Sequence, residues 1–208
     1  MKKIKIQIKN RFTGSVLFEY EKEENTIKDT VVEAVNNGAD LRDADLRGVY
    51  LVGAYLVGAD LRGAYLVGAN LRGADIRDAD LRDANLRDAK YIPFIPMACP
   101  TDGDFIGWKK VNYGEKNYLV KLMVPADAKR CSSTGRKCRC SKALVLDISL
   151  LVDGKEAGKE KNVINNRYVP TLYEVGKVVE PDSFDENRFK ECSHGIHFFI
   201  DRQEAINY

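Results

Sequence analysis

The sequence predicts a β-rich protein in three parts: an amino-terminal hairpin and helix, a short repetitive β segment, and a carboxy-terminal α+β domain. Apolar residues alternate with charged ones near the amino terminus, and Leu or Ile recurs at every fifth position in the middle. The repeat is then lost, and apolar runs separated by turn residues follow. We expect these parts to span residues 1–38, 39–90 and 91–208.

The first part predicts a β-hairpin followed by a short amphipathic helix. Apolar and polar residues alternate over residues 4–8 and again over 16–20, on either side of a turn. Asn25 or Thr26 is then suited to begin a helix, and the Asn-Gly pair at 37–38 is suited to end it. This helix directly precedes the repeats, so we expect it to cap them.

In the second part, ten Leu or Ile residues stand five positions apart, each with Ala or Val two residues before it. A period of five fits neither an α-helix nor a strand and indicates a repeat architecture. The ten positions are Leu41, Leu46, Leu51, Leu56, Leu61, Leu66, Leu71, Ile76, Leu81 and Leu86.

These units resemble the pentapeptide-repeat family, whose units read roughly Ala-(Asp/Asn)-Leu-x-x and wind into a right-handed quadrilateral β-helix. The resemblance covers residues 39–88. It implies that the central Leu or Ile points inward and that four units make one coil. Ten units would give two and a half coils, with a rise of about 12 Å at the ladder spacing of about 4.8 Å. Solenoid ends need caps, so we expect the flanking segments to close them.

The outward positions of such coils would recur every 20 residues. Three Asp and three Arg then form neighbouring rows on one side, at Asp40, Asp60, Asp80, Arg42, Arg62 and Arg82. We interpret them as a solvated face that neutralises itself. Family members that inhibit or protect DNA gyrase are long, strongly acidic rods that imitate a DNA duplex. Residues 39–88 hold nine Asp and seven Arg, so charge and length disfavour a DNA-mimic gyrase modulator, which is kept as a further alternative.

Aromatic and β-branched residues replace these charges in three units. The residues are Tyr50, Val52, Tyr55, Val57, Tyr65 and Val67. Their outward placement predicts an apolar patch, which soluble monomers seldom leave open. We expect the amino-terminal hairpin, the carboxy-terminal domain or a second copy of the chain to cover it as an interface, which leaves a homo-oligomer open. The alternative is that these side chains only stack along the ladder.

The third part predicts strands over 105–111, 118–124, 143–152, 175–180 and 195–200, and a closing helix over 202–208. It resembles an uncharacterised domain that follows pentapeptide repeats in proteins of bacteriophages and their hosts. The resemblance rests on FIGWKK at 105–110, VPADAKR at 124–130, GRKCR at 135–139, Cys192 and GIHFF at 195–199. A weaker similarity links the Pro-Ala-Asp and Lys-Cys-Arg segments, and the Cys-x-x-Gly-Ile-His segment, to a phage lysis-inhibition family in which the two parts occur in the opposite order. These likenesses imply a phage-associated protein but no defined activity.

A basic segment, AKRCSSTGRKCRCSK, is the best binding candidate. Its cations are Lys129, Arg130, Arg136, Lys137, Arg139 and Lys142, with no acid between them. The Ser, Thr and Gly residues at 132–135 add backbone N–H groups, and the combination suits a phosphate-bearing ligand. The alternative is a solvated basic loop.

Cysteine and histidine residues could carry other chemistry. Six potential metal ligands, Cys131, Cys138, Cys140, Cys192, His194 and His197, lack the Cys-x-x-Cys spacing of zinc sites, so we predict reduced thiols and no metal or cofactor. Cys192 and His197 are weak candidates for a catalytic pair, and an enzyme that uses them is the main alternative function. No P-loop, Rossmann or nucleophile-elbow motif appears, which favours a non-enzymatic protein.

Composition favours a cytoplasmic protein. The net charge is +2, five cysteines suit a reducing compartment, and the start MKKIKIQIKN lacks the apolar block of a signal peptide. No apolar run approaches the ~20 residues of a membrane span, and no membrane partner is expected. We therefore expect an interaction protein that uses the repeats as a rigid platform and the last domain to contact a protein or phosphate-bearing partner.

Overall fold

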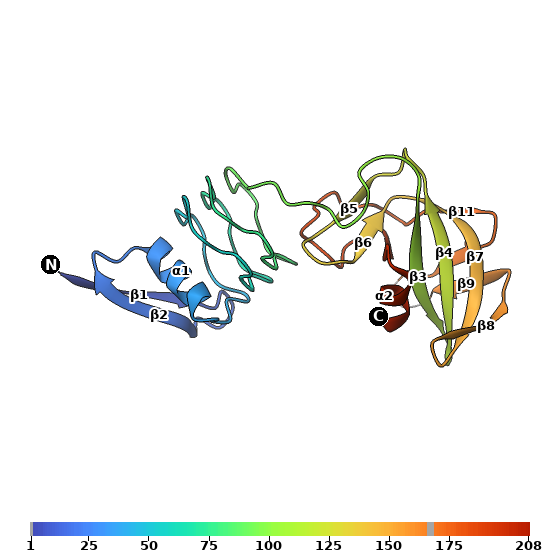
Figure 1. The fold of residues 1–208 in the computed structure, drawn as a ribbon, viewed down its shortest axis with the longest axis horizontal. Helices are drawn as coiled ribbons and strands as arrows, with labels where there is room; N and C mark the ends of the chain where they lie inside the picture. Colours follow the sequence, from blue (N-terminus) through green and yellow to red (C-terminus); the bar gives the residue numbers. More distant parts are fainter. Residues whose placement is uncertain (1, 166–168) are drawn as a thin grey trace. The chain divides into compact units, whose positions relative to one another are not determined.

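The computed structural model describes residues 2–165 and 169–208, which form a β-rich protein. The chain divides into two compact units, Met1–Pro96 and Met97–Tyr208. The first unit contains the hairpin, a helix and the repeats, and the second contains the remaining strands and a short helix (Figure 1). Among the described residues, neither helix has the length and apolar character that crossing a bilayer requires.

The first unit opens with the predicted hairpin and helix. Strands β1 (Lys3–Lys9) and β2 (Val16–Glu23) pair antiparallel, and helix α1 spans Ile27–Asn36. Of the two predicted caps, Thr26 is the one that begins the helix, because its hydroxyl accepts from the backbone N–H of Asp29 at 3.1 Å. Asn25 instead donates its side-chain amide to the carbonyl of Tyr20 at 2.9 Å.

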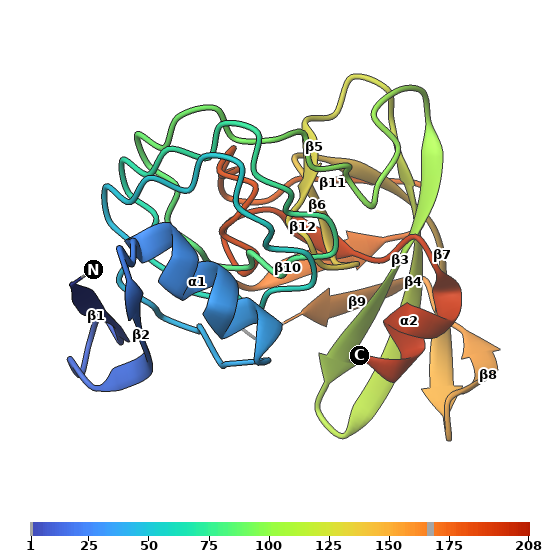
Figure 2. The same ribbon diagram turned by 60° about the vertical axis from the view of Figure 1, so that its left-hand side comes forward.

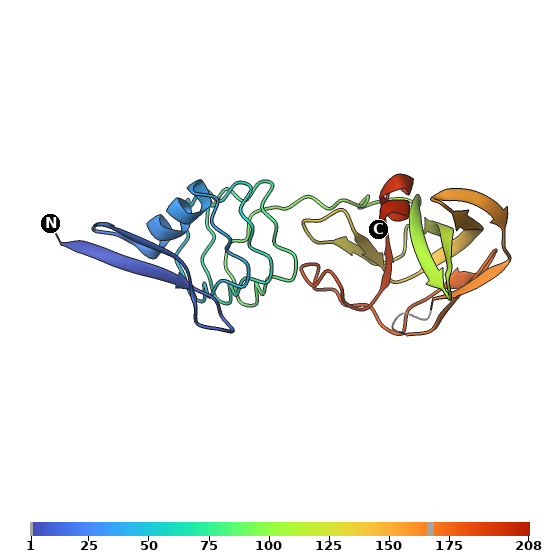
Figure 3. The same cartoon turned by 90° about the horizontal axis from the view of Figure 1, so that it is seen from below.

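The repeat residues bury their central side chains as predicted. The ten Leu and Ile residues from Leu41 to Leu86 are between 0 and 8% exposed. Parallel bridges join residues twenty positions apart, such as Tyr50 with Asn70 and Asn70 with Lys90. The chain therefore returns to the same row after every four units, as the stacked turns in Figure 3 show.

Each five-residue repeat contains a turn, and the spacing of the Leu residues alone does not predict which residue types occupy it. The carbonyl of the central Leu or Ile accepts from the N–H three residues later in nine of the ten units, at 3.0–3.2 Å. The residue just before that N–H is always Gly or Asp, from Asp43 to Asp88, with φ between 56° and 70°. Only glycine adopts this left-handed backbone freely, and Asp tolerates it better than most residues. The geometry is that of a type II turn.

The hairpin supplies the backbone partners for the first repeat units. Asn10 bridges Ala44 antiparallel, and the N–H groups of Arg11 and Asp45 donate to the carbonyls of Asp43 and Lys9, both at 2.8 Å. Helix α1 lies beside these units (Figure 2). The expected cap thus includes the hairpin as well as the helix.

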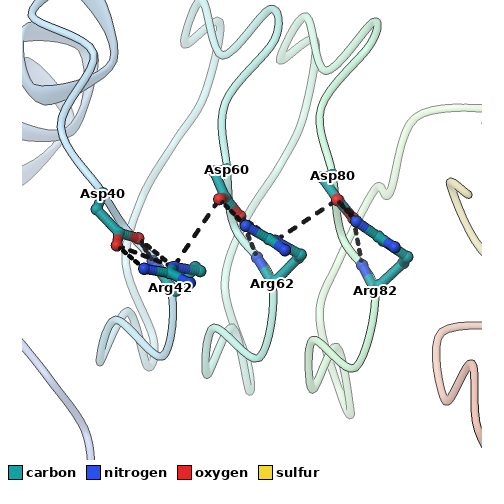
Figure 4. A network of polar contacts seen from close by, with 6 residues as sticks. All are labelled: Asp40, Arg42, Asp60, Arg62, Asp80 and Arg82. Atoms are coloured by element: carbon teal, nitrogen blue, oxygen red, sulfur yellow. Dashed lines mark hydrogen bonds and ion pairs between the residues drawn. The ribbon is translucent and has the colours of Figure 1, made fainter.

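The Asp and Arg side chains of one row form a continuous network along the repeat (Figure 4). Arg62 donates from Nε to Asp60 of its own unit at 2.8 Å. The same nitrogen lies 3.6 Å from the carboxylate of Asp80, twenty residues further on. Arg42 likewise reaches Asp40 at 2.8 Å and Asp60 at 4.0 Å. The hydrogen bond from Arg42 holds the pKa of Asp40 at about 2.

A five-stranded antiparallel sheet forms the centre of the second unit. Its order is β11-β7-β4-β3, and β8 pairs with the far end of the same β7 edge as β11. The strands are β3 (Phe105–Tyr113), β4 (Lys116–Val124), β7 (Ala143–Val152), β8 (Lys155–Lys159) and β11 (Val178–Val179). Strand β11 covers only two residues of the predicted strand 175–180, because Gly176 turns with φ +81°.

Smaller elements complete this unit. Strands β12 (Ile196–Phe198), β6 (Cys138–Cys140) and β5 (Arg130–Ser132) form one sheet, and β9 (Asn162–Asn165) pairs with β10 (Thr171–Glu174). Helix α2 spans Arg202–Asn207. Strand β4 is buried on both faces: Val120 and Leu122 join the main core, whereas Leu119 packs in a second cluster with Ala205 and Ile206 of α2.

Candidate functional site

The site begins with the pairing of β6 and β12. In this register Cys140 faces Ile196, Arg139 faces His197 and Cys138 faces Phe198. The side chains of Cys138, Cys140, Ile196 and Phe198 belong to the main core. Because strand side chains alternate, Arg139 and His197 project to the other face of this small sheet.

Arg139 holds the loop before β12 in place, although its own side chain is almost fully buried (3% exposed). Its guanidinium donates to the carbonyls of Asp185 at 2.7 Å, Asn187 at 3.0 Å and Lys190. Gly195 has φ +142°, and a Cβ there would lie 2.2 Å from Cγ of Arg139. The glycine of the Cys-x-x-Gly-Ile-His segment is therefore required for this packing.

The loop and β12 border a cavity of about 450 Å³. Its walls combine apolar and polar groups from segments far apart in the chain. The lining includes Lys109, Lys137, Cys192, His194, His197 and Tyr208. The volume lies within the range of about 300–1,000 Å³ that is typical of small-molecule sites.

Lys137 lies at the wall of this cavity, and its side chain is only 8% exposed. Its Nζ lies 3.1 Å from Sγ of Cys192 and 3.2 Å from the hydroxyl of Tyr208. A carboxylate oxygen of Glu191 lies 3.9 Å from the same Nζ. Burial lowers the pKa of Lys137, but the hydrogen bonds to Cys192 and Tyr208 outweigh it and keep the pKa above its usual value. The ammonium therefore stays charged inside the wall.

His197 lines the same cavity in its neutral form. Burial, followed by the charges of Lys109 and Lys137, lowers the pKa of His197 to about 4. Its Nε2 donates to the carbonyl of Glu191 at 3.0 Å. In the described contacts, Cys192 is bonded to Lys137 and not to His197. The two weak catalytic candidates thus share a cavity but have separate partners.

His194 lies at a more open position, with 58% of its side chain exposed. Its Nδ1 is 3.1 Å from a carboxylate oxygen of Asp182. This contact lowers the pKa of Asp182. The carboxylate of Asp182, which also lines the cavity, therefore has the imidazole of His194 as a polar partner.

The other cations of the basic segment bind partners within the same unit and do not converge on one site. Lys129 pairs with Glu186, Arg136 with Glu204 at 2.8 Å, and Lys142 with Asp127 at 2.7 Å. Arg130 donates to the carbonyls of Gly103, Pro125, Ala126 and Ala128 at 2.6–3.1 Å. Much of the segment forms β5 and β6, so it is not a free basic loop. Acids outside the segment thus pair with three of its cations, and backbone carbonyls hold Arg130 and Arg139. Of the six cations only Lys137 lines the cavity.

The cysteine and histidine residues do not gather around one point. Among the described residues, no group of three or more His, Cys, Asp or Glu side chains is arranged to hold a metal ion. Cys131, Cys138 and Cys140 are buried. Burial raises the pKa of Cys131 and brings that of Cys140 to about 12. Cys192 differs because it is exposed.

The six residues predicted to form an interface on the repeats differ in their solvent exposure. Tyr50 is 71% exposed, Tyr55 53% and Val52 42%, while Val57 and Val67 are half-buried. Tyr65 is half-buried as well. The guanidinium groups of Arg11 and Arg47 each lie 5.5 Å from the centre of its ring. The turn of the hairpin, which contains Arg11, therefore helps to cover one of the three tyrosines.

Sequence reasoning missed Lys109 and Tyr208 as members of the site. Lys109 lies in the middle of β3, and its Nζ donates to the carbonyl of His197 at 3.1 Å. Tyr208 directly follows α2. Neither carries a local pattern that marks it, although the FIGWKK motif contains Lys109.

Comparison with known proteins finds one matching family model for each of the two compact units. The model of a family of unknown function, DUF5758, matches residues 95–205. The model of pentapeptide repeats matches residues 37–63 and 54–90. The chain is also similar to uncharacterized protein L223 of Acanthamoeba polyphaga mimivirus, with 40% identity over 73 residues. That alignment covers 35% of this chain and 46% of the viral protein, so it spans less than half of that relative. No solved structure matches. The chain is thus a member of the DUF5758 family and carries pentapeptide repeats ahead of the family domain.

Proposed function

We propose that this protein is a binding protein whose DUF5758 domain takes a small phosphate-bearing anion into the cavity beside Lys137. The observation that carries this proposal is a cavity of about 450 Å³ whose lining includes Lys109, Lys110 and Lys137. Hydrogen bonds from Lys109 and Lys137 go to groups that themselves line the cavity. Ammonium groups held in this way are preorganised to meet an anion.

Charge in the surrounding wall supports an anion over a cation. Asp182 also lines the cavity, but His194 engages its carboxylate. Lys129, Arg136 and Lys142 have acidic partners of their own. Of the six cations in the basic segment, Lys137 is the one that lines the cavity, where its ammonium donates to the thiol of Cys192 and the hydroxyl of Tyr208. We therefore place the proposed phosphate site at Lys137 and not along the whole basic segment.

In this proposal, the ten repeats together form a right-handed four-sided β-helix that acts as a rigid platform. Turns every five residues and bridges every twenty support four sides per coil. The exposed Tyr50, Val52 and Tyr55 give this platform a surface for a protein partner or a second copy. Similarity to a mimivirus protein supports a role associated with a virus. The paired Asp and Arg rows offer no uncompensated acidic face, so we do not propose DNA mimicry.

The anion site is tested by titrating inorganic pyrophosphate into the full-length protein and following binding by calorimetry. Removal of the charge in Lys137→Met should weaken binding on the order of tenfold, the equivalent of one charge-assisted hydrogen bond. Lys142→Met is the matched control, because Lys142 belongs to the same basic segment but pairs with Asp127. An equal loss in both variants, or no binding to the wild type at millimolar pyrophosphate, would refute the proposed site.

A further inference from the structure

Cys192 differs from the other four cysteines in its surroundings. Cys99, Cys131, Cys138 and Cys140 are buried, whereas Cys192 is exposed and lines the cavity. Its sulfur accepts a hydrogen bond from the ammonium of Lys137 at 3.1 Å. A small molecule that enters the cavity would therefore meet the thiol of Cys192 together with the largely buried ammonium that donates to it.

Lys137 is positioned to assist chemistry at that sulfur. Its side chain is only 8% exposed, so little water screens its charge. The hydroxyl of Tyr208, at 3.2 Å, fixes the ammonium from another side, and the ring of Tyr208 lies 5.3 Å from Nζ. An ammonium that donates to sulfur stabilises the negative charge of a thiolate, which is the nucleophilic form of cysteine.

We propose that Cys192 is a thiol–disulfide exchange site for small anionic disulfides. The thiolate of Cys192 attacks one sulfur of the incoming disulfide. A new S–S bond forms between them while the original S–S bond breaks, and the second half leaves as a thiolate that takes a proton from water. Cys192 is oxidised and the small disulfide is reduced, so no other oxidant is needed.

The preference for an anionic disulfide rests on the proposed anion site. Lys109 and Lys137 lie on the cavity wall with Cys192, so carboxylates of the incoming molecule would be attracted beside the reacting sulfur. The cavity of about 450 Å³ has room for a tripeptide-sized thiol. Glutathione disulfide, which carries several carboxylates, is a suitable probe, and bis(2-hydroxyethyl) disulfide is its uncharged counterpart.

The test incubates the full-length protein with each disulfide and follows the adduct by intact mass and peptide mapping. We expect one glutathionyl group, located at Cys192 and absent in Cys192→Ser. The quantity compared is the rate of modification by glutathione disulfide divided by the rate with the neutral disulfide. At low salt, we expect this ratio to be on the order of tenfold higher for the protein than for a free cysteine peptide, and added salt should reduce the difference. A ratio equal to that of the peptide would refute the proposal, whatever the variants do.

Substitutions separate the role of the cation from that of the fold. Lys137→Met should slow glutathionylation on the order of tenfold, Lys137→Arg should retain much of the rate, and Lys142→Met should match the wild type. If Lys137→Met unfolds, the ratio of the two disulfides in the wild type still decides the question. Pyrophosphate binding by Cys192→Ser distinguishes the two proposals. If Cys192→Ser still binds pyrophosphate and Cys192 of the wild type shows no preference for the anionic disulfide, only the exchange site is overturned. If the wild type does not bind pyrophosphate, both proposals are overturned.

Discussion

At the scale of single residues, the turn position of the repeat shows how backbone strain selects residue types. All ten turn residues from Asp43 to Asp88 have φ between 56° and 70°, and all are Gly or Asp. A left-handed backbone costs other L-residues about 1–2 kcal/mol each. Ten such penalties would rival the total stability of a domain of this size, about 5–15 kcal/mol.

Gly53 allows this effect to be measured without a steric clash, because a Cβ there would have no neighbour within 4 Å and φ is +65°. We expect Gly53→Val to lower the free energy of unfolding by about 1–2 kcal/mol. The matched variant Gly53→Asp should lose less, since Asp already holds this position in four other units. Urea denaturation measures both, and equal losses would show that backbone strain does not select the residue.

His197 predicts a pH dependence for the second unit. Its pKa is lowered to about 4 in the folded protein, against 6.5 for the free side chain. The unfolded chain therefore takes up a proton at higher pH than the folded chain does. The stability due to neutral His197 is complete above about pH 6.5 and is lost as the pH falls toward 4, by about 3 kcal/mol at most.

His197→Gln isolates this contribution, because the amide does not titrate and can still donate a hydrogen bond. The difference in the free energy of unfolding between wild type and His197→Gln should shrink between pH 7 and pH 4. Denaturant titrations at each pH give this difference, in which the acid groups common to both proteins cancel. A difference that is constant over this range would contradict the burial-driven pKa of His197.

Sequence reasoning identified part of the site but not its connections. The sequence marks Lys137, Cys192 and His197 as candidates, but for different roles. The contact between Lys137 and Cys192 joins residues 55 positions apart, and the contact between Lys137 and Tyr208 joins residues 71 apart. Such contacts depend on how strands and loops pair, which local residue patterns do not encode.

At the scale of elements, the rows of Asp and Arg link successive turns of the repeat. Arg62 bonds to Asp60 in its own unit and lies 3.6 Å from Asp80 in the next turn. Arg77 offers a matched control, since its described salt bridge is to Asp75 of its own unit. Exposed pairs contribute little singly, about 0–1 kcal/mol, but a network can exceed that.

We expect Arg62→Met to lower the free energy of unfolding by a small but measurable amount at low salt. Arg77→Met should lower it less, and 1 M NaCl should remove most of the difference because it screens exposed charges. Urea denaturation at the two salt concentrations gives the four values. A larger loss in Arg77→Met, or a difference that salt leaves unchanged, would show that the link between turns contributes nothing.

The elements that could be predicted are those whose signal is local. The hairpin, α1, β3, β4, β7 and α2 carry clear apolar periodicity or caps, and each appears close to its expected position. The buried Leu and Ile positions of the repeats follow from their period of five. By contrast, β5 and β6 have three residues each and occur in a segment rich in cations. Strand β6 pairs with β12 and places Cys138 and Cys140 in the main core, and β5 pairs with β6, so this small sheet depends on a partner strand from elsewhere in the chain.

At the scale of the whole molecule, the cavity depends on the assembly of the entire second unit. Its wall joins Lys109 of β3, Lys137 before β6, Cys192 on a loop and Tyr208 after α2. The carbonyl groups of that loop bind Arg139, so the loop is fixed independently of any ligand. The proposed binding site therefore depends on the folded arrangement of these segments and not on any one of them alone.

The first unit presents a surface that a second copy of the chain is suited to cover. Tyr50, Val52 and Tyr55 are exposed on its repeat units, and an open cluster of such residues favours association. In Val52→Arg/Val57→Arg/Val67→Arg, each Val is replaced by the residue that other units use at that position. We expect this variant to lose concentration-dependent self-association, because charges on the patch would have to be desolvated in an interface.

Sedimentation velocity over a range of protein concentrations measures this association, and circular dichroism checks that the repeats are intact. The matched control replaces the same three residues with Thr, which keeps the β-branched shape without charge and should retain most of the association. Arginine at these positions should leave the turns unaffected, since Arg47, Arg77 and Arg87 occupy equivalent places in the same stack. If the Arg variant keeps the oligomeric state and thermal midpoint of the wild type, the patch is not an interface. The tyrosines and valines would then only stack on neighbouring side chains along the repeats.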